Sequence, residues 1–372
     1  MTPANRTANT SRTASAPRAT GTERAADTER PGRTVVVLGA SGFLGGALTG
    51  ALARRPGELR LVARRPTPVP AGSVAEVRAY RADLTEPDPL GPLVADADVV
   101  FQLVAHTDNG WRVADGDPVA EAVNVGTTRR LVAALRERPA GRPPPVVVFA
   151  GTTSQSGPTG GRPLTGAEPD RPVTAYCRQK LAAERLLKDA TAEGVLRAVS
   201  LRLPTVYGPG PAGSGVPRGV VAAMAASALA GRPLTIWGDG SVLRDLLHAD
   251  DVVSAFLLAA DHAGELAGRH WPVGTGHGMS LRALFSLIAE VVAEHTGRPP
   301  VPVVRVDPPA GAVAADTESV RVDAGAFRSR TGWTPVTDLR AGVRETVARL
   351  AAEFPAGADG SGPRTVPGPG RA

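Results

Sequence analysis

Continuous runs of β-branched and other apolar residues alternate with helical patterns along the first half of the chain. The strand-like runs cover residues 34–38, 59–63, 77–80, 98–105, 146–149 and 198–203. Runs that are apolar at every position are typical of strands buried on both faces. Helical periodicity follows the first run through residue 52 and returns over 118–138 and 176–193. This alternation predicts an α/β fold with a doubly wound parallel sheet.

After Pro204 the pattern changes to segments rich in glycine and proline with shorter helices. We therefore predict a first domain over residues 34–202 and a smaller carboxyl-terminal lobe, mainly over 203–355, some of whose segments return to the sheet. Residues 1–33 and 356–372 are rich in Thr, Ala and Arg or in Gly and Pro, with no apolar period. Such segments cannot offset the entropy of ordering, so we predict disordered tails.

The net charge of +6 changes this picture little, because four of the six charges lie in the two tails. No basic face with interleaved aromatic residues is present, so we do not expect nucleic-acid binding. The single cysteine, Cys177, excludes a disulfide framework and a multi-cysteine metal site, and we predict no metal. No stretch reaches the ~18 apolar residues of a membrane span. Since no secretion signal is evident either, we expect a cytoplasmic protein without membrane association.

A glycine-rich turn follows the first predicted strand, in the segment GASGFLG at residues 39–45. Gly39 permits a tight turn, Gly42 allows close approach of a pyrophosphate, and Gly45 allows close packing of the helix on the strand. The first N–H groups of that helix would then face the phosphates. The segment predicts a dinucleotide-binding site; an ordinary βα turn is the alternative.

The end of the second predicted strand indicates which dinucleotide. An NAD enzyme places a carboxylate there for the ribose 2′-hydroxyl. This chain has Arg64 and Arg65 instead, with no acidic residue between Leu59 and Glu76. Arginines suit a 2′-phosphate, so we predict NADPH rather than NAD; a solvated basic loop is the alternative. Asp83, just past the third strand, could accept a hydrogen bond from the adenine amino group or act as a simple cap.

Tyr176 and Lys180 lie one helical turn apart, on one face of the predicted helix 176–193. A tyrosine with a pKa of ~10 is a poor acid–base group at neutral pH, and a nearby cation lowers that pKa. The chain has only three tyrosines and two lysines, so a coincidental pair at this spacing would be rare. The pair predicts proton transfer close to a nicotinamide ring.

Together these motifs resemble the extended short-chain dehydrogenase/reductase family, which includes epimerases, dehydratases and reductases of nucleotide sugars. The further matching segments are NVGT at 124–127, LRLPTVYGPG at 201–210, WGDG at 237–240 followed by Arg244 and Asp245, and TGWTP at 331–335. The resemblance extends from about residue 34 to residue 351. It implies a Rossmann cofactor domain and a smaller lobe that holds a nucleoside diphosphate sugar.

The resemblance also implies residue roles. Tyr176 would donate or accept the proton, and Lys180 would lower its pKa and bind the nicotinamide ribose. Thr152, five residues before Gly157, would supply the hydroxyl that orients the substrate carbonyl. Residues 149–157 resemble the family's Ser-Ser-x-x-Val-Tyr-Gly stretch. Because Gln155 and Ser156 replace the Val-Tyr of this family pattern, Thr153 is the alternative. Arg244 would pair with the substrate diphosphate.

The implied cofactor site comprises Gly39, Ser41, Gly42, Phe43, Leu44, Gly45, Arg64, Arg65, Asp83, Leu84, Ala105, Asn124, Tyr176, Lys180 and Leu203. The implied substrate site comprises His106, Thr152, Thr153, Thr205 and Arg244. Thr205 stands where many members have Asn. His106 could equally be a polar residue that ends a strand.

Within the family, dehydratases place Asp-Glu directly after the catalytic threonine, whereas Thr153 and Ser154 follow here, which argues against dehydration. Exchangeable NADPH favours net reduction. The segments 103–117 and 65–70 resemble 4-ketoreductases of antibiotic deoxysugar pathways. We therefore predict reduction of the C4 keto group of a dTDP-4-keto-6-deoxyhexose, including 2,6-dideoxy sugars.

Three alternatives stay open: a redox-neutral 4-epimerase with bound NAD, a reductase of non-nucleotide ketones, and a non-catalytic NADP-sensing protein. Arg244 and the WGDG segment argue against the second, and the Tyr176/Lys180 pair argues against the third. The resemblance further implies a homodimer that pairs through the helices at 118–138 and 176–193.

Overall fold

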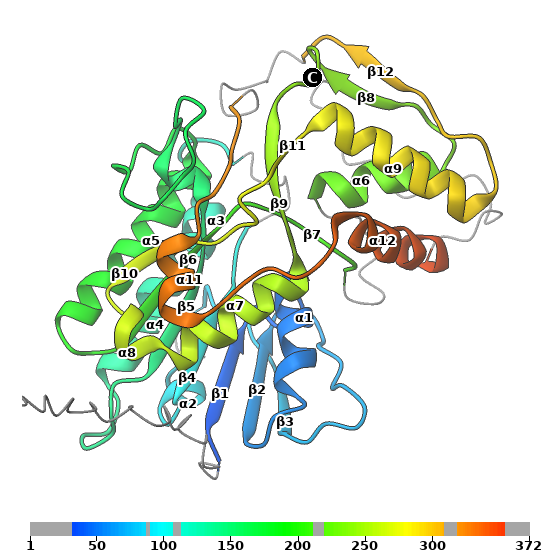
Figure 1. Ribbon diagram of the computed structural model, residues 1–372. Coiled ribbons are helices and arrows are strands. Elements are labelled where there is room, and N and C mark those ends of the chain that lie inside the picture. Colours follow the sequence, from blue (N-terminus) through cyan, green and yellow to red (C-terminus); the bar gives the residue numbers. More distant parts are fainter. Residues whose placement is uncertain (1–31, 87–89, 107–112, 211–218, 309–317, 354–372) are drawn as a thin grey trace, which may run out of the picture. The chain divides into compact units, whose positions relative to one another are not determined.

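The computed structural model describes residues 32–86, 90–106, 113–210, 219–308 and 318–353 (Figure 1). These residues all belong to one compact unit, Gly32–Ala372. Both predicted tails fall largely outside the described residues, as do residues 107–112 of the segment that resembles 4-ketoreductases.

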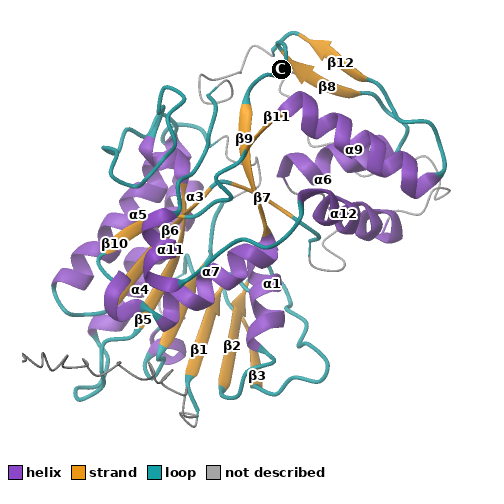
Figure 2. Ribbon diagram, viewed as in Figure 1, coloured by secondary structure: helices purple, strands orange, loops and turns teal. Residues whose placement is uncertain are grey.

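A seven-stranded parallel sheet forms the centre of the unit, with the strand order β10-β6-β5-β4-β1-β2-β3 (Figure 2). Its strands are β1 (Thr34–Leu38), β2 (Glu58–Ala63), β3 (Glu76–Arg81), β4 (Val99–Gln102), β5 (Val146–Thr152), β6 (Arg197–Leu203) and β10 (Arg269–Pro272). The prediction of a doubly wound parallel sheet is confirmed. β10, from the carboxyl-terminal part of the chain, lies in the same sheet and pairs with β6.

Alternate residues of the strands pack into two separate cores, one on each face of the sheet. Val37 and Phe101 face α1 (Phe43–Leu52) and α7 (Ala249–Asp261), while Val36 and Val100 face the opposite core. That second core includes side chains of α2 (Gly91–Val94), α4 (Thr127–Arg136) and α5 (Ala175–Ala192). Burial on both faces explains why these strands are continuously apolar.

Most of the remaining elements make a third core. It forms mainly between α6 (Gly219–Leu229), α9 (Leu281–Thr296) and α12 (Leu339–Glu353). Beside these helices lie β7 (Thr205–Tyr207), β9 (Leu243–His248) and β11 (Gly278–Ser280) in one small sheet, and β8 (Leu234–Trp237) with β12 (Val303–Val306) in another. The short helices α8 (Ala263–Leu266) and α11 (Gly325–Thr331) pack instead on the large sheet, where Ala263, Leu266 and Phe327 belong to the first core.

Three predicted elements differ from the structure. The helix expected over 118–138 is α3 (Pro118–Glu121), a π-helical turn (Ala122–Gly126) and α4 in sequence, because Asn124 is drawn into hydrogen bonds described below. The strand expected over 98–105 ends at Gln102, while the strand expected to end at 149 continues to Thr152 alongside β6. None of the described helices is both long and apolar enough to span a bilayer.

Candidate active site

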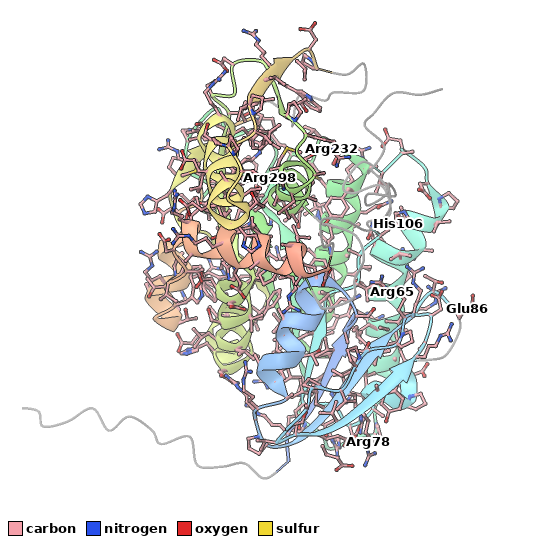
Figure 3. All side chains as sticks on the ribbon, turned by 90° about the vertical axis from the view of Figure 1, so that its right-hand side faces the viewer. Arg65, Arg78, Glu86, His106, Arg232 and Arg298 are labelled. Carbon is pink, nitrogen blue, oxygen red and sulfur yellow. The ribbon has the colours of Figure 1, made fainter. Side chains whose placement is uncertain are left out.

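Many of the predicted site residues follow the carboxyl ends of parallel strands, which meet at one edge of the sheet. The glycine turn follows β1, Arg64 and Arg65 follow β2, and Ala105 and His106 come shortly after β4. Thr152 ends β5, and buried Leu203 ends β6. Figure 3 labels Arg65 and His106, both toward this edge, and Arg78, which lies toward the other end of β3. The fold thus gathers residues that are up to about 165 positions apart in the chain, from Gly39 to Leu203, since each of them ends or follows a strand of one sheet.

The turn between β1 and α1 has the backbone geometry that a dinucleotide motif requires. Gly39 has φ = +92°, a conformation that side chains disfavour. A Cβ atom at Gly45 would lie only 2.1 Å from the carbonyl oxygen of Gly39. Gly42 begins α1 without a side-chain cap, and no acidic residue stands in the first turn. The N–H groups at this helix end therefore suit an anion such as a pyrophosphate.

Arg64 and Arg65 are exposed, directly past β2. Arg65 donates from Nη2 to the carbonyl oxygen of Ser41 at 3.2 Å, which connects this loop to the glycine turn. Arg81, at the end of β3, donates from Nε to the carbonyl oxygen of Arg64 at 3.1 Å. Three guanidinium groups therefore originate where the ends of β2 and β3 adjoin, an arrangement suited to a phosphate.

Asp83 caps the turn that follows β3. Its Oδ1 accepts the N–H of Thr85 at 2.9 Å and the Thr85 hydroxyl at 2.7 Å. These hydrogen bonds, with the nearby charge of Arg64, hold the pKa of Asp83 below its ordinary value. The cap considered as an alternative is thus present, and contact with an adenine stays a prediction. Leu84 beside it is buried.

Tyr176 and Lys180 lie in the first two turns of α5, which Thr174 caps by accepting the N–H of Cys177. The Lys180 side chain is 2% exposed, and its Nζ lies 4.7 Å from the ring centroid of Phe149 on β5. No carboxylate of the described residues forms an ion pair with it. Burial without a counterion lowers the pKa of Lys180 to about 8.

The pKa of Tyr176 moves in the opposite direction from the one that its neighbouring lysine suggests. Burial, with a smaller effect of Cys177, raises the pKa of Tyr176 above its ordinary value. Desolvation disfavours the charged phenolate and is the main cause of this rise in the pKa of Tyr176. The phenol is protonated at neutral pH, as it would be at the ordinary pKa of ~10, and this is the form that a proton donor needs.

Thr152 stands where β5 meets the 3₁₀ turn Thr153–Ser156. Its Oγ1 accepts the N–H of Ser154 at 3.3 Å, so its own hydroxyl hydrogen is not used in that contact. The side chain of Thr153 is buried, whereas that of Thr152 is partly exposed. This favours Thr152 over Thr153 as the hydroxyl that meets a ligand.

Asn124 lies in the π-helical turn and connects β4 to α5. Its Oδ1 accepts the N–H of His106 at 2.8 Å, and its Nδ2 donates to Oε1 of Gln179 at 2.8 Å. Both ends of the amide thus bind protein groups. The buried Asn124 orders the backbone at the end of β4, next to the predicted cofactor site.

Arg244 on β9 donates from Nη1 to the carbonyl oxygens of Leu243 and Glu318. These contacts fix one side of the guanidinium. Asp245, the next residue, is fully buried and accepts four hydrogen bonds. Their donors are the N–H and hydroxyl of Thr275 and the N–H groups of Gly276 and Val322. Thr205 begins β7, which pairs with β9, so Thr205 and Arg244 belong to the same small sheet.

Comparison with known proteins identifies the family. Residues 35–274 match the NAD dependent epimerase/dehydratase family. The chain is 33% identical to a UDP-glucose 4-epimerase of Mycolicibacterium smegmatis, over 72% of this chain and 80% of the other. It is 31% identical to a dTDP-6-deoxy-L-talose 4-dehydrogenase (NAD(P)(+)) of Kitasatospora kifunensis, over 84% of this chain and 93% of the other.

The chain belongs to the NAD-dependent epimerase/dehydratase family. Among solved structures, MoeE5 in complex with UDP-glucose and NAD is similar, with a TM-score of 0.73 and 30% identity. The match covers 86% of this chain and 99% of that one. The predicted membership in the extended short-chain dehydrogenases/reductases and the Rossmann-type fold are confirmed.

Behind the predicted catalytic residues of this family member lies a buried charged cluster that the sequence did not reveal. Glu184 on α5 is fully buried and accepts hydrogen bonds from Arg202 at 2.8 and 3.1 Å and from Lys188 at 2.7 Å. His270 on β10 lies 3.2 Å from the same carboxylate. Burial alone would raise the pKa of Glu184, but the hydrogen bonds from His270 and Arg202 and the nearby positive charges hold it well below its ordinary range.

Proposed function

We propose that the protein is an NADPH-dependent ketoreductase that reduces the C4 keto group of a dTDP-4-keto-6-deoxyhexose, including 2,6-dideoxy sugars. The observation that carries the proposal is the pair of arginines, Arg64 and Arg65, at the end of β2, in a chain that retains Tyr176 and Lys180. A 2′-phosphate would meet guanidinium groups there, where an NAD enzyme has a carboxylate.

The residues present fit a dinucleotide, since the glycine turn leaves no room for a side chain at Gly45 and the first turn of α1 has no side-chain cap. When bound, NADPH supplies a hydride to a carbonyl carbon. The glycine turn with Ser41, Phe43 and Leu44 would hold its pyrophosphate. Arg64 and Arg65 would hold the 2′-phosphate, and Asp83 with Leu84 the adenine. Ala105, Asn124, Lys180 and Leu203 would surround the nicotinamide riboside.

Tyr176 donates a proton to the carbonyl oxygen of the substrate in this proposal. Its phenol carries that proton at neutral pH, because even the ordinary pKa of a tyrosine is ~10. Thr152 donates a hydrogen bond to the same oxygen and orients the carbonyl. The ammonium of Lys180 favours the phenolate that remains after the proton has left, and it can hold the nicotinamide ribose.

The substrate assignment is supported by the relative named a dTDP-6-deoxy-L-talose 4-dehydrogenase, because reduction of a 4-keto group is the reverse of 4-dehydrogenation. Arg244 would pair with the diphosphate, and its contacts with Leu243 and Glu318 orient it. His106 and Thr205 would contribute to the sugar pocket.

The test is to incubate the purified protein with NADPH and a panel of nucleotide 4-keto sugars while following NADPH absorbance. We expect oxidation of NADPH with dTDP-4-keto-6-deoxyhexoses and slower reaction with NADH. No oxidation with any 4-keto nucleotide sugar would contradict the proposal, and activity restricted to non-nucleotide ketones would contradict the substrate class.

A redox-neutral 4-epimerase with NAD is the second candidate. The 33% identity to the UDP-glucose 4-epimerase of M. smegmatis favours it. An epimerase keeps its cofactor between turnovers, so NAD would remain bound through purification. Release of the cofactor from denatured protein, followed by its identification as NAD or NADP, separates the two candidates.

We also propose a cytoplasmic homodimer that pairs through the region of α3 and α4 and through α5. Size-exclusion chromatography with light scattering measures the mass directly. A monomer at micromolar concentration would contradict this part of the proposal.

A further inference from the structure

The 3₁₀ turn after β5 sends one side chain inward. Gln155 is fully buried, and both ends of its amide are used. Its Oε1 accepts the backbone N–H of Thr152 at 2.8 Å, and its Nε2 donates to Oε2 of Glu184 at 2.8 Å. A Cβ atom at Gly151 would lie 2.8 Å from the same Oε1, so a glycine at 151 leaves the space that this amide fills.

The Glu184 carboxylate, which accepts the Gln155 amide, is itself held in place by other side chains. It lies on α5, two helical turns beyond Tyr176 and one beyond Lys180. Arg202 and Lys188 fix its carboxylate with three hydrogen bonds. The chain of contacts from Thr152 through Gln155 to Glu184 therefore joins the end of β5 to the helix that carries the other two predicted catalytic side chains.

We propose that Gln155 is a positioning residue that fixes Thr152 in register with Tyr176 and Lys180 through its hydrogen bonds to the Thr152 backbone and to Glu184. The inference rests on the proposed roles of these three residues in ketone reduction. An apolar side chain, as in the Val of the family pattern, could make neither bond. In this chain the hydrogen-bonded amide sets the position of the hydroxyl that orients the carbonyl.

The first test replaces Gln155 by Met, which has similar length but no amide. Because a displacement of about 1 Å can cost ~100-fold in rate, we expect kcat for the 4-keto sugar to fall about 10- to 100-fold. The Kd for NADPH should stay within about twofold, since the glycine turn and the arginines are remote from this contact. Ser156→Ala is the matched control, because it removes only the acceptor of Arg202 Nη1 at 3.0 Å in the same turn.

The second test is a rescue. Gln155→Glu places two carboxylates against each other and should lower kcat at least as much as Gln155→Met. Adding Glu184→Gln exchanges the amide and the carboxylate, so that residue 184 donates to residue 155 and residue 155 accepts the Thr152 N–H. The exchange removes the acceptor of Arg202 Nε at 3.1 Å, while Arg202 Nη2 keeps its ion pair with Asp170 at 2.7 Å. We therefore expect the double variant to have a kcat at least about tenfold higher than Gln155→Glu, a coupling that a merely structural role would not produce.

Equal kcat losses in Gln155→Met and Ser156→Ala, or no recovery in the double variant while thermal unfolding stays cooperative, would overturn the inference. Wild-type protein that reduces no 4-keto nucleotide sugar would instead contradict the proposed function. Amide hydrogen exchange over residues 146–157 then decides this inference. Faster exchange in Gln155→Met than in Ser156→Ala supports it, and equal rates overturn it.

Discussion

The two lysine ammonium groups of α5, one in each half of the helix, lie in opposite environments. Lys180, in the first half, is buried against the Phe149 ring and forms no ion pair with a described carboxylate. Lys188, two turns further on, donates to Glu184 at 2.7 Å inside a cluster that also includes Arg202. The sequence contains no other lysine. An ammonium that is buried without a counterion costs stability, which fits the proposed role of Lys180 in binding a ligand, whereas the paired ammonium of Lys188 belongs to the packing of the fold.

The ends of β2 and β3 repeat this contrast with arginines. At the amino ends, Arg78 pairs with Glu76 at 2.5 Å and with Glu58 at 3.4 Å. At the carboxyl ends, Arg64 and Arg65 form no ion pair with a described carboxylate, and Arg65 donates to a backbone carbonyl. Paired charges thus mark the scaffold, and unpaired charges mark the edge where the cofactor would bind.

The largest effect is expected at Tyr176. Tyr176→Phe removes the proton donor, so we expect kcat for the 4-keto sugar to fall at least about 1,000-fold, within the range of general acid catalysis. The Kd for NADPH and the thermal unfolding temperature should barely change. Turnover near the wild-type rate would show that another group supplies the proton.

The contrast between unpaired Arg64 and Arg65 and paired Arg78 predicts an effect on cofactor binding that is smaller than the effect of Tyr176→Phe on kcat. We expect Arg64→Ala combined with Arg65→Ala to raise the Kd for NADPH about 10- to 100-fold, because two charge-assisted contacts to phosphate are lost, and to leave the Kd for NADH almost unchanged. Arg78→Ala, at the other end of β3, is the control and should affect neither. Calorimetric titration measures the Kd of each of the two variants for NADPH and for NADH. An equal loss of affinity for NADPH and NADH would contradict a 2′-phosphate site.

Lys180→Met should stabilise the protein without cofactor. Burial lowers the pKa of Lys180 from 10.5 to about 8, so its protonated form is disfavoured in the folded state. Below about pH 8 both states bind the proton and the penalty is complete, so the variant should gain about 1–3 kcal/mol in free energy of unfolding. The gain should shrink as the pH rises from about 8 to 10.5, because wild-type stability increases over that window. Urea unfolding at about pH 7 and about pH 10 measures the difference.

Lys188→Met should change the free energy of unfolding in the opposite direction, and its effect should be the smallest of the four. It removes one of the cations around Glu184 while Arg202 and His270 remain. We expect a loss of about 1 kcal/mol in free energy of unfolding near pH 7. If both lysine variants changed stability in the same direction, the contrast between the two halves of α5 would be wrong.

The local patterns predicted most of the fold. The apolar run at residues 34–38, the glycine turn after it and the helix around Tyr176 all appear as expected, because each depends on neighbours in sequence. The interruption of the helix at Asn124 was missed, since its cause is a hydrogen bond to His106 and another to Gln179 on a different helix. The buried partners of Glu184 were missed for the same reason.

By itself, the sequence determined the order of strands and helices, the glycine turn and the Tyr176/Lys180 pair, since periodicity and short spacings are local properties of the chain. Only the tertiary structure decided the environment of each charged group. It left Lys180 without a described counterion while pairing Lys188, and it placed Gln155 between Thr152 and Glu184. Burial and pairing depend on which distant segments pack together, and those properties decide whether a charged side chain supports the fold or is available to a ligand.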